Sequence, residues 1–255
     1  MALLVMLRQF LLAVQFLTRL PVPNRLATSE EELGRAAAFF PLVGVIVGGS
    51  TAGIYLLALR VVSVWVAVPI ALAFAAFITS GFHEDGLADT FDGLGGGWTK
   101  DRALEIMRDS RIGTYGALAL TFLVLGKYVT ITEVGSELVW RWLIVAHVAA
   151  RWTVLPLCRW LPYARSEGAG KLVAKQITLS ALVIGSLTFL LTLLLFPWRT
   201  GLIAIGVTIV VTFISGLYYK RRLSGITGDC LGATNQITEL LLYLTAHVLY
   251  RFNGC

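Results

Sequence analysis

Charged residues are scarce in this chain. Only 14% of its 255 residues are Asp, Glu, Lys or Arg, whereas soluble domains average about 25%. Apolar residues make up 57% of the chain, and its mean hydropathy is +0.78. So little charge cannot cover a surface that faces water. This excludes a disordered chain, a coiled coil and an ordinary soluble enzyme, and it predicts an integral membrane protein whose surroundings are the lipid bilayer.

Cysteine is also scarce. Cys158, Cys230 and Cys255 form no C-x-x-C pair and leave an odd count, which excludes a disulfide framework and a cysteine zinc site and predicts free thiols. The net charge is +6. In a membrane protein this excess belongs to the loops that stay on the cytoplasmic side. We therefore expect no nucleic-acid partner.

Long apolar runs organise the whole chain. A helix of about 20 residues crosses the hydrocarbon layer of a bilayer, and seven runs approach that length: 36–59, 62–81, 114–132, 138–157, 177–196, 200–219 and 231–250. The prediction is an all-α, polytopic helical bundle of about seven spans that forms one domain over residues 1–255. In residues 1–20, Arg8, Gln15 and Arg19 share one helical stripe, which favours an amphipathic helix lying at the interface. An eighth span is the alternative.

The basic residues indicate the orientation. With the N-terminus inside, 15 of the 21 Lys and Arg residues fall in the segments 1–35, 82–113, 158–176 and 220–230. Cytoplasmic loops carry such an excess. We therefore expect a multi-pass protein of the cytoplasmic (inner) membrane, with residues 82–113 as a cytoplasmic catalytic loop.

Acidic residues gather in that same loop. Five of the six aspartates lie there, and Asp85, Asp89 and Asp92 have the i, i+4, i+7 spacing of one helical face. Like charges at this spacing destabilise a helix, so the arrangement needs an external cation. Mg²⁺ takes carboxylate oxygens together with substrate phosphates and water. The pattern predicts a Mg²⁺ site on this face; a solvated acidic loop is the alternative.

Several other polar residues are candidates for a site. Arg111 precedes an apolar run and is placed to hold a phosphate, whereas Arg102 equally fits a salt-bridged surface helix. Arg151 lies inside a span, where a cation is a functional candidate unless it snorkels. Asp229 is either a helix N-cap or, with Glu239, a second metal-binding wall.

Residues 81–116 resemble the cobalamin synthase family, also called adenosylcobinamide-GDP ribazoletransferase. The similarity lies in Gly-Phe-His-x-Asp-Gly-Leu-Ala-Asp-Thr-x-Asp-Gly and in Asp-Arg-x-Leu-Glu-Ile-Met-Arg-Asp-Ser-Arg-Ile-Gly-Thr-Tyr-Gly. It extends to Phe16–Pro23, Phe40–Gly44, Tyr163–Arg165, Thr227–Ala233 and Glu239. These motifs occur in order over nearly the whole chain.

The resemblance implies a Mg²⁺-dependent transferase for substituted phosphate groups. It would join adenosylcobinamide-GDP to α-ribazole, or to its 5′-phosphate, and release GMP, as the last step of cobalamin nucleotide-loop assembly. Such a transfer needs positioning and charge neutralisation. The expected metal ligands are Asp85, Asp89, Asp92 and Glu239. The expected catalytic residues, as acceptors of the hydroxyl proton, are Asp109, Asp229 or His83, and the expected substrate-binding residues are Arg102, Ser110, Arg111, Arg151, Tyr163 and Arg165.

Two other functions compete with this interpretation. A CDP-alcohol phosphotransferase also uses several aspartates on membrane helices, but its Asp-x-x-Asp-Gly-x-x-Ala-Arg pattern is absent, because Gly95-Gly96-Gly97 stands where Ala-Arg should follow. An ion-coupled transporter would place its carboxylates within the spans and show inverted repeats. Here only Glu239 is clearly within a span. The sequence is compatible with a homo-oligomer.

Overall fold

The computed structural model describes residues 2–22, 26, 29–165 and 177–253. In these residues it contains no β-strand, only an isolated bridge between Tyr163 and Ile226. The all-α prediction is confirmed. The helices are α1 (Ala2–Leu17), α2 (Glu30–Ala36), η1 (Ala37–Phe39), α3 (Phe40–Ala58), α4 (Val64–Ile78), α5 (Phe82–Gly96), α6 (Lys100–Ile106), α7 (Thr114–Thr132), α8 (Ser136–Trp152), α9 (Val154–Trp160), α11 (Leu179–Thr192), η2 (Leu193–Leu195), α12 (Trp198–Leu223) and α13 (Gly228–Asn253).

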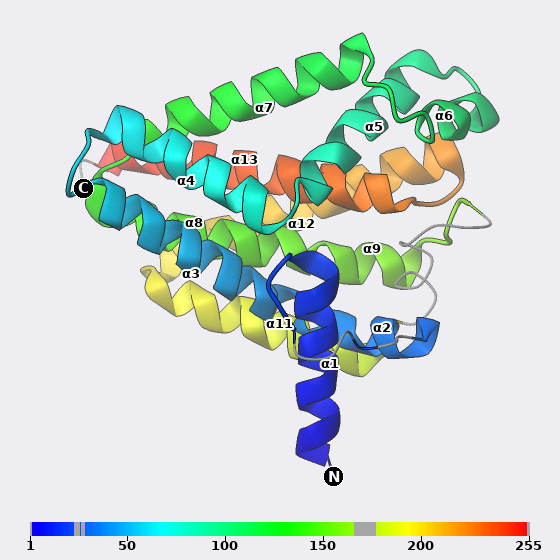
Figure 1. The fold of residues 1–255 in the computed structure, drawn as a ribbon, viewed down its shortest axis with the longest axis horizontal. Helices are drawn as coiled ribbons and strands as arrows, with labels where there is room; N and C mark the ends of the chain where they lie inside the picture. The colour runs from blue at the N-terminus through cyan, green and yellow to red at the C-terminus, as the bar shows by residue number, and fades with distance from the viewer. Residues whose placement is uncertain (1, 23–25, 27–28, 166–176, 254–255) are drawn as a thin grey trace.

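The long helices run along the long axis of the molecule (Figure 1). The connections 59–63, 133–135 and 193–197 meet at one end of this bundle, together with the C-terminus. The other end carries α5, α6, the end of α9, and the turn between α12 and α13 (Figure 1). The predicted catalytic loop 82–113 lies at this second end, and the structure shows that most of it is helical. We treat α5 and α6 as lying outside the spanning segments.

Each of the seven predicted spans corresponds to helical structure, but the helices differ in their capacity to cross a bilayer. Four stretches of the described chain are long and apolar enough by themselves: Glu31–Ala58, Thr114–Thr132, Ser136–Trp160 and Trp198–Leu223. A fifth is added if α4 and α5 count as one span, although they are bent by 87°. α4 and α11 are only 15 and 14 residues long. The structure is an all-α membrane bundle in which α4 and α11 are too short to cross a bilayer by themselves.

Close packing of α3 on α8 fixes the centre of the bundle. A Cβ atom on Gly48 would lie 2.7 Å from the Cα atom of Ile144, and one on Gly44 would lie 2.6 Å from the carbonyl oxygen of His147. Small residues allow membrane helices to approach this closely. The contact fixes the position of α8, the helix that carries His147 and Arg151.

The N-terminal helix α1 crosses the direction of the bundle helices (Figure 1). Its first half exposes Leu3, Leu4 and Leu7, whereas Leu12 and Leu17 in its second half are buried against the bundle. A helix perpendicular to the spans runs parallel to the membrane surface. The arrangement therefore favours the predicted interfacial helix over an eighth span.

The end of α1 is joined to the bend between α4 and α5. The backbone N–H of Arg19 donates to the carbonyl of Ile78 at 2.9 Å, its Nε donates to Ser80 Oγ at 3.0 Å, and its guanidinium lies 4.5 Å from the ring centre of Phe77. Ser80 and Gly81 have φ values of 60° and 66°, a left-handed conformation that turns the chain sharply. The Arg19 contacts brace this bend, from which the aspartate-bearing helix α5 starts.

Candidate active site

A glycine contact brings α5 and α13 together. A Cβ atom on Gly86 would lie 3.0 Å from the carbonyl oxygen of Asp229 and 3.2 Å from the Cα atom of Gly232. A Cβ on Gly232 would similarly meet the backbone of His83 and Gly86. Because the two backbones touch, the acidic face of α5 lies beside the first turn of α13.

Asp85, Asp89 and Asp229 meet at this crossing and form the aspartate cluster. Asp85 is exposed, and the other two are half-buried. The pKa of Asp89 is raised to about 7, first by burial and then by the negative charges of Asp85 and Asp229, while Arg165 acts in the opposite direction. Burial also raises the pKa of Asp229. Three carboxylates facing one guanidinium leave an excess of negative charge.

A backbone bridge places Arg165 in the cluster. The N–H of Ala164 donates to the carbonyl of Ile226 at 2.8 Å, and the N–H of Ile226 donates to the carbonyl of Pro162 at 2.9 Å. The segment after α9 is thereby fixed against the start of α13. Arg165 Nη2 then lies 2.7 Å from Asp229 Oδ2, and Tyr163, beside the bridge, is half-buried.

Asp92 has other partners than the aspartate cluster. Its carboxylate accepts hydrogen bonds from the backbone N–H groups of Gly113 at 2.7 Å and Gly116 at 2.9 Å. These amides belong to the start of α7, where free N–H groups attract an anion. Asp92, predicted as a metal ligand, therefore fixes the entry into α7 and the preceding loop in this structure.

The loop that Asp92 holds forms an open hollow of about 550 Å³, and Arg102, Asp109 and Arg111 are among the residues that line it. Arg111 Nη2 donates to Asp109 Oδ2 at 2.6 Å, and Arg102 Nη1 donates to Glu105 Oε2 at 2.8 Å. The hydrogen bonds from Arg111 lower the pKa of Asp109 to about 2. Ser110 is exposed in the same turn. The hollow presents two guanidinium groups next to α5.

Glu239, Lys127, His147 and Arg151 form a buried ionic cluster, separate from the aspartates. Lys127 Nζ lies 2.6 Å from Glu239 Oε2, His147 Nδ1 lies 2.7 Å from Glu239 Oε1, and Arg151 Nη1 lies 3.8 Å from the same oxygen. Glu239 follows Asp229 by ten residues, about 15 Å along a helix. The structure does not bring this predicted ligand to the aspartate cluster.

His83 belongs to the surroundings of the buried ionic cluster. It is buried at the start of α5 and lines the same cavity as His147, Arg151 and Glu239. The sequence did not lead us to predict Lys127, His147 or Gln236 as site residues. The available signal was an ionisable residue inside an apolar run, which in a membrane protein points to function.

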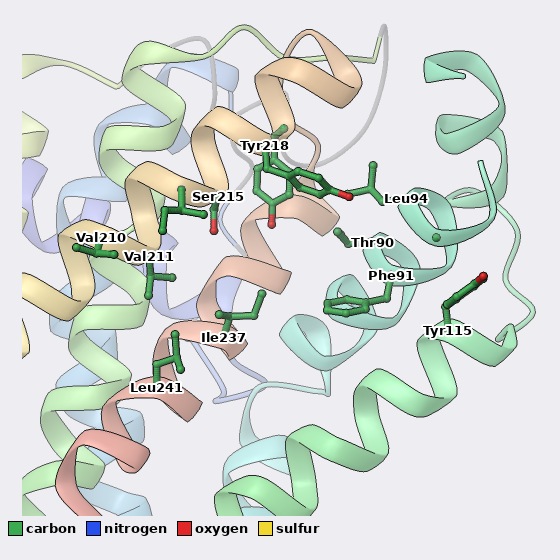
Figure 2. Close-up of a pocket in the computed structure, with 13 residues that line it drawn as sticks. Thr90, Phe91, Leu94, Tyr115, Val210, Val211, Ser215, Tyr218, Ile237 and Leu241 are labelled. Atoms are coloured by element: carbon green, nitrogen blue, oxygen red, sulfur yellow. The ribbon is translucent and has the colours of Figure 1, made fainter. Parts of the chain in front are cut away.

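A third cavity, of about 420 Å³, lies between α5, α12 and α13. Figure 2 shows Phe91 and Tyr115 on one side of it and Ser215 and Tyr218 on the other. None of its lining residues carries a charge, and none is a predicted site residue. It is an uncharged, mainly apolar cavity beside α5.

In the described residues, neither the cysteines nor the acidic side chains form a closed metal site. Cys158 and Cys230 are free and buried, as predicted, and Cys255 lies outside the described residues. Within the described ranges, no three His, Cys, Asp or Glu side chains are grouped closely enough to hold a metal ion by themselves. The aspartate cluster is thus an open set of carboxylates.

Comparison with known proteins identifies the family. The family model described as cobalamin-5-phosphate synthase matches residues 9–247. The chain belongs to this family. The prediction made from the motifs is confirmed, and the family is one of enzymes.

Curated relatives agree over nearly the full length. An adenosylcobinamide-GDP ribazoletransferase of Vibrio cholerae is 42% identical over 242 residues, which cover 93% of this chain and 92% of the relative. Proteins of the same name from Ralstonia nicotianae and Shewanella woodyi are 40% and 39% identical, each covering 92% of this chain and 93% of the relative. No solved structure matches the chain.

Proposed function

We propose that the protein joins adenosylcobinamide-GDP to α-ribazole, or to its 5′-phosphate, and releases GMP. The observation that carries this proposal is the aspartate cluster, held beside Arg165 in a member of the cobalamin-5-phosphate synthase family. Full-length similarity to proteins named for this transfer supports the choice of substrates.

The donor set of the aspartate cluster fits Mg²⁺. This ion keeps several waters and takes one or two carboxylates plus substrate phosphates, so an open group of acids with excess negative charge suits it better than a closed cage. Asp85 and Asp89 would hold the ion, with Asp229 beside them. When bound, Mg²⁺ neutralises charge on the diphosphate and polarises its phosphoryl oxygens.

The chain's own residues then position and neutralise the substrates. The ribose 3′-hydroxyl attacks the phosphorus that carries the cobinamide arm, a new P–O bond forms, and the bond to the oxygen of GMP breaks. GMP leaves with that electron pair. Arg165 faces the aspartate cluster with its side chain mostly buried, and its guanidinium stabilises the charge that develops on the phosphoryl oxygens.

Asp229 is the strongest of the three predicted acceptors for the hydroxyl proton. Asp109 is a weak base because Arg111 holds its pKa at about 2, and His83 lies with the buried ionic cluster. Burial raises the pKa of Asp229, and Asp229 lies next to Asp85 and Asp89. Arg102 and Arg111, in the neighbouring hollow, would bind the GDP portion.

The orientation of the site is also a proposal. The described end of the bundle that carries α5 and α6 contains most of the basic segments, which supports a cytoplasmic position for the aspartate cluster in the inner membrane. Labelling of a single cysteine introduced at Asp101, in intact cells and in inverted vesicles, tests this. Labelling only in inverted vesicles is expected.

A direct assay tests the activity. The protein, purified in detergent, is incubated with adenosylcobinamide-GDP, α-ribazole and Mg²⁺, and mass spectrometry follows both products. We expect adenosylcobalamin and GMP in equal amounts, with both lost in EDTA. GMP without the cobamide would point to hydrolysis or another acceptor. Neither product from folded protein would refute the proposal.

A further inference from the structure

A cavity of about 390 Å³ lies between α4 and α7, beside the bend that starts α5. Apolar side chains from α4 and α7 form its walls, among them Pro69, Leu72 and Leu123. Its floor is polar and comes from α5, α8, α13 and Lys127 of α7. Figure 1 shows α4 and α7 converging toward the C-terminal end of the bundle, with α5 joining them at the other end.

The floor contains the buried ionic cluster. The side chain of Glu239 is 2% exposed and that of Arg151 is 1% exposed. Besides its contact with Glu239, Lys127 Nζ donates to Gln236 Oε1 at 2.5 Å. A buried ionic network is often no more stable than a well-packed apolar core of the same volume. Ionisable groups within a membrane bundle therefore point to a function.

The charges in the cavity cancel. Lys127 and Arg151 contribute two cations, and Glu239 and Glu84 contribute two carboxylates. The Lys127 ammonium already occupies the place beside Glu239 that a metal ion would need. An anion such as phosphate would find Lys127 paired with Glu239 and Arg151 within 3.8 Å of the same carboxylate. The balance therefore favours a ligand without net charge.

Two buried polar atoms on this cavity lack partners. Among the described residues, neither Glu84 Oε2 nor Arg151 Nε makes a hydrogen bond, although both atoms are buried. Leaving a buried polar group unpaired costs about 1–3 kcal/mol. One acceptor and one donor are thus available to a polar ligand at the floor, while the walls are mainly apolar.

We propose that this cavity binds the nucleoside part of the acceptor, α-ribazole; the inference rests on the proposed function and names the site of its second substrate. The flat benzimidazole base, which has no exocyclic polar group, packs between the walls of α4 and α7. Ribose hydroxyls other than the attacking 3′-hydroxyl pair with Glu84 and Arg151. A guanine base would leave several polar groups unpaired against these walls, and a corrin ring is too large for the cavity.

The cavity is also next to the chemistry. Glu84 precedes Asp85 directly in α5, and Asp89 follows Asp85 by one turn, about 6 Å along the helix. A ribose held at Glu84 therefore lies within one or two helical turns of the aspartate cluster. Transfer requires the attacking hydroxyl to lie about 3–3.5 Å from the phosphorus, so the ribose must extend from Glu84 toward the aspartate cluster.

A substitution that fills the cavity with a larger side chain tests the proposal. Ala76 lines it from α4, and Val66, on the same helix, is exposed and lines none of the three cavities. Binding of α-ribazole to the full-length protein is measured by calorimetry without the second substrate. We expect Ala76→Phe to raise the Kd for α-ribazole at least tenfold and Val66→Phe to leave it unchanged. In turnover, Ala76→Phe should raise the KM for α-ribazole and spare that for adenosylcobinamide-GDP.

The outcomes separate the two proposals. Wild-type affinity in Ala76→Phe, or a raised KM for adenosylcobinamide-GDP instead, would overturn the site while leaving the function in place. Binding that Ala76→Phe weakens, without product from the wild type, would keep the site and remove the function. If Ala76→Phe does not fold, Ala73→Phe, at the exposed rim of the cavity, takes its place with the same expected outcomes.

Discussion

The aspartate cluster and the buried ionic cluster both include a residue of α13, but they differ in how far the chain neutralises their carboxylates. In the first, Asp85, Asp89 and Asp229 face one guanidinium, that of Arg165. In the second, Glu239 is surrounded by Lys127, His147 and Arg151. The first has an excess of negative charge, whereas the second carries its cations within the chain. An acid on a membrane helix is therefore a candidate metal ligand only when the chain does not itself neutralise it.

The largest expected effect is on turnover, from the aspartate cluster. Asp89→Asn should reduce kcat by roughly 10²-fold or more, because it removes a carboxylate from the proposed Mg²⁺ site. The melting temperature in detergent should stay the same or rise, since the change removes repulsion from Asp85 and Asp229. Steady-state kinetics and thermal unfolding check both parts.

Asp101→Asn is the matched control, because Asp101 is an exposed acid on α6 that lines none of the three cavities described. It should retain wild-type kinetics. Full activity of Asp89→Asn would contradict the metal assignment.

The next effect is on stability, from the buried ionic cluster. Glu239→Gln removes the carboxylate that pairs with Lys127 and lies beside Arg151, which should destabilise the protein by about 3–5 kcal/mol. Thermal or denaturant unfolding in detergent measures the change. The double variant Glu239→Gln/Lys127→Met should recover part of the loss, because the ammonium group that loses its carboxylate is also removed.

Glu133→Gln, at the exposed end of α7, serves as the control and should unfold like the wild type. If Glu239→Gln also unfolds like the wild type, the contrast between the two clusters is wrong.

The smallest expected effect tests the contact that joins the two regions. Gly86→Ala would place a Cβ 3.0–3.2 Å from the backbone of α13, and such overpacking costs about 1–3 kcal/mol. We expect lower stability and a moderate loss of kcat, because α5 must shift away from Asp229. Gly53→Ala meets no atom within 4 Å and should be neutral or slightly stabilising. Equal behaviour of the two variants would show that the close approach has no role.

The sequence predicted the helical class, the positions of the apolar helices and the family, because these depend on composition, run length and ordered motifs. The i, i+4 spacing also predicted that Asp85 and Asp89 share one face. The same periodicity includes Asp92, but it gave no sign that the carboxylate of Asp92 accepts hydrogen bonds from the amides of Gly113 and Gly116 on another segment. Periodicity within a helix carries no information about what packs against it.

Glu239 shows the same limit. Its place on the helix that begins at Asp229 made it a plausible metal ligand, and Lys127 was visible as a charge within an apolar run. That the two meet at 2.6 Å depends on how α7 packs against α13. Sequence distance between them exceeds a hundred residues, and only the three-dimensional arrangement shows that one charge cancels the other.

The contacts of Arg19 have a consequence for how the protein responds to its surroundings. Arg19 ties the end of α1 to Ser80, two residues before α5 begins, and the first half of α1 exposes leucines, as expected of a helix at the membrane interface. Headgroup packing and membrane curvature act on a helix in that position. Through the Arg19 contacts, a displacement of α1 is transmitted to the start of α5, the helix that carries Asp85 and Asp89.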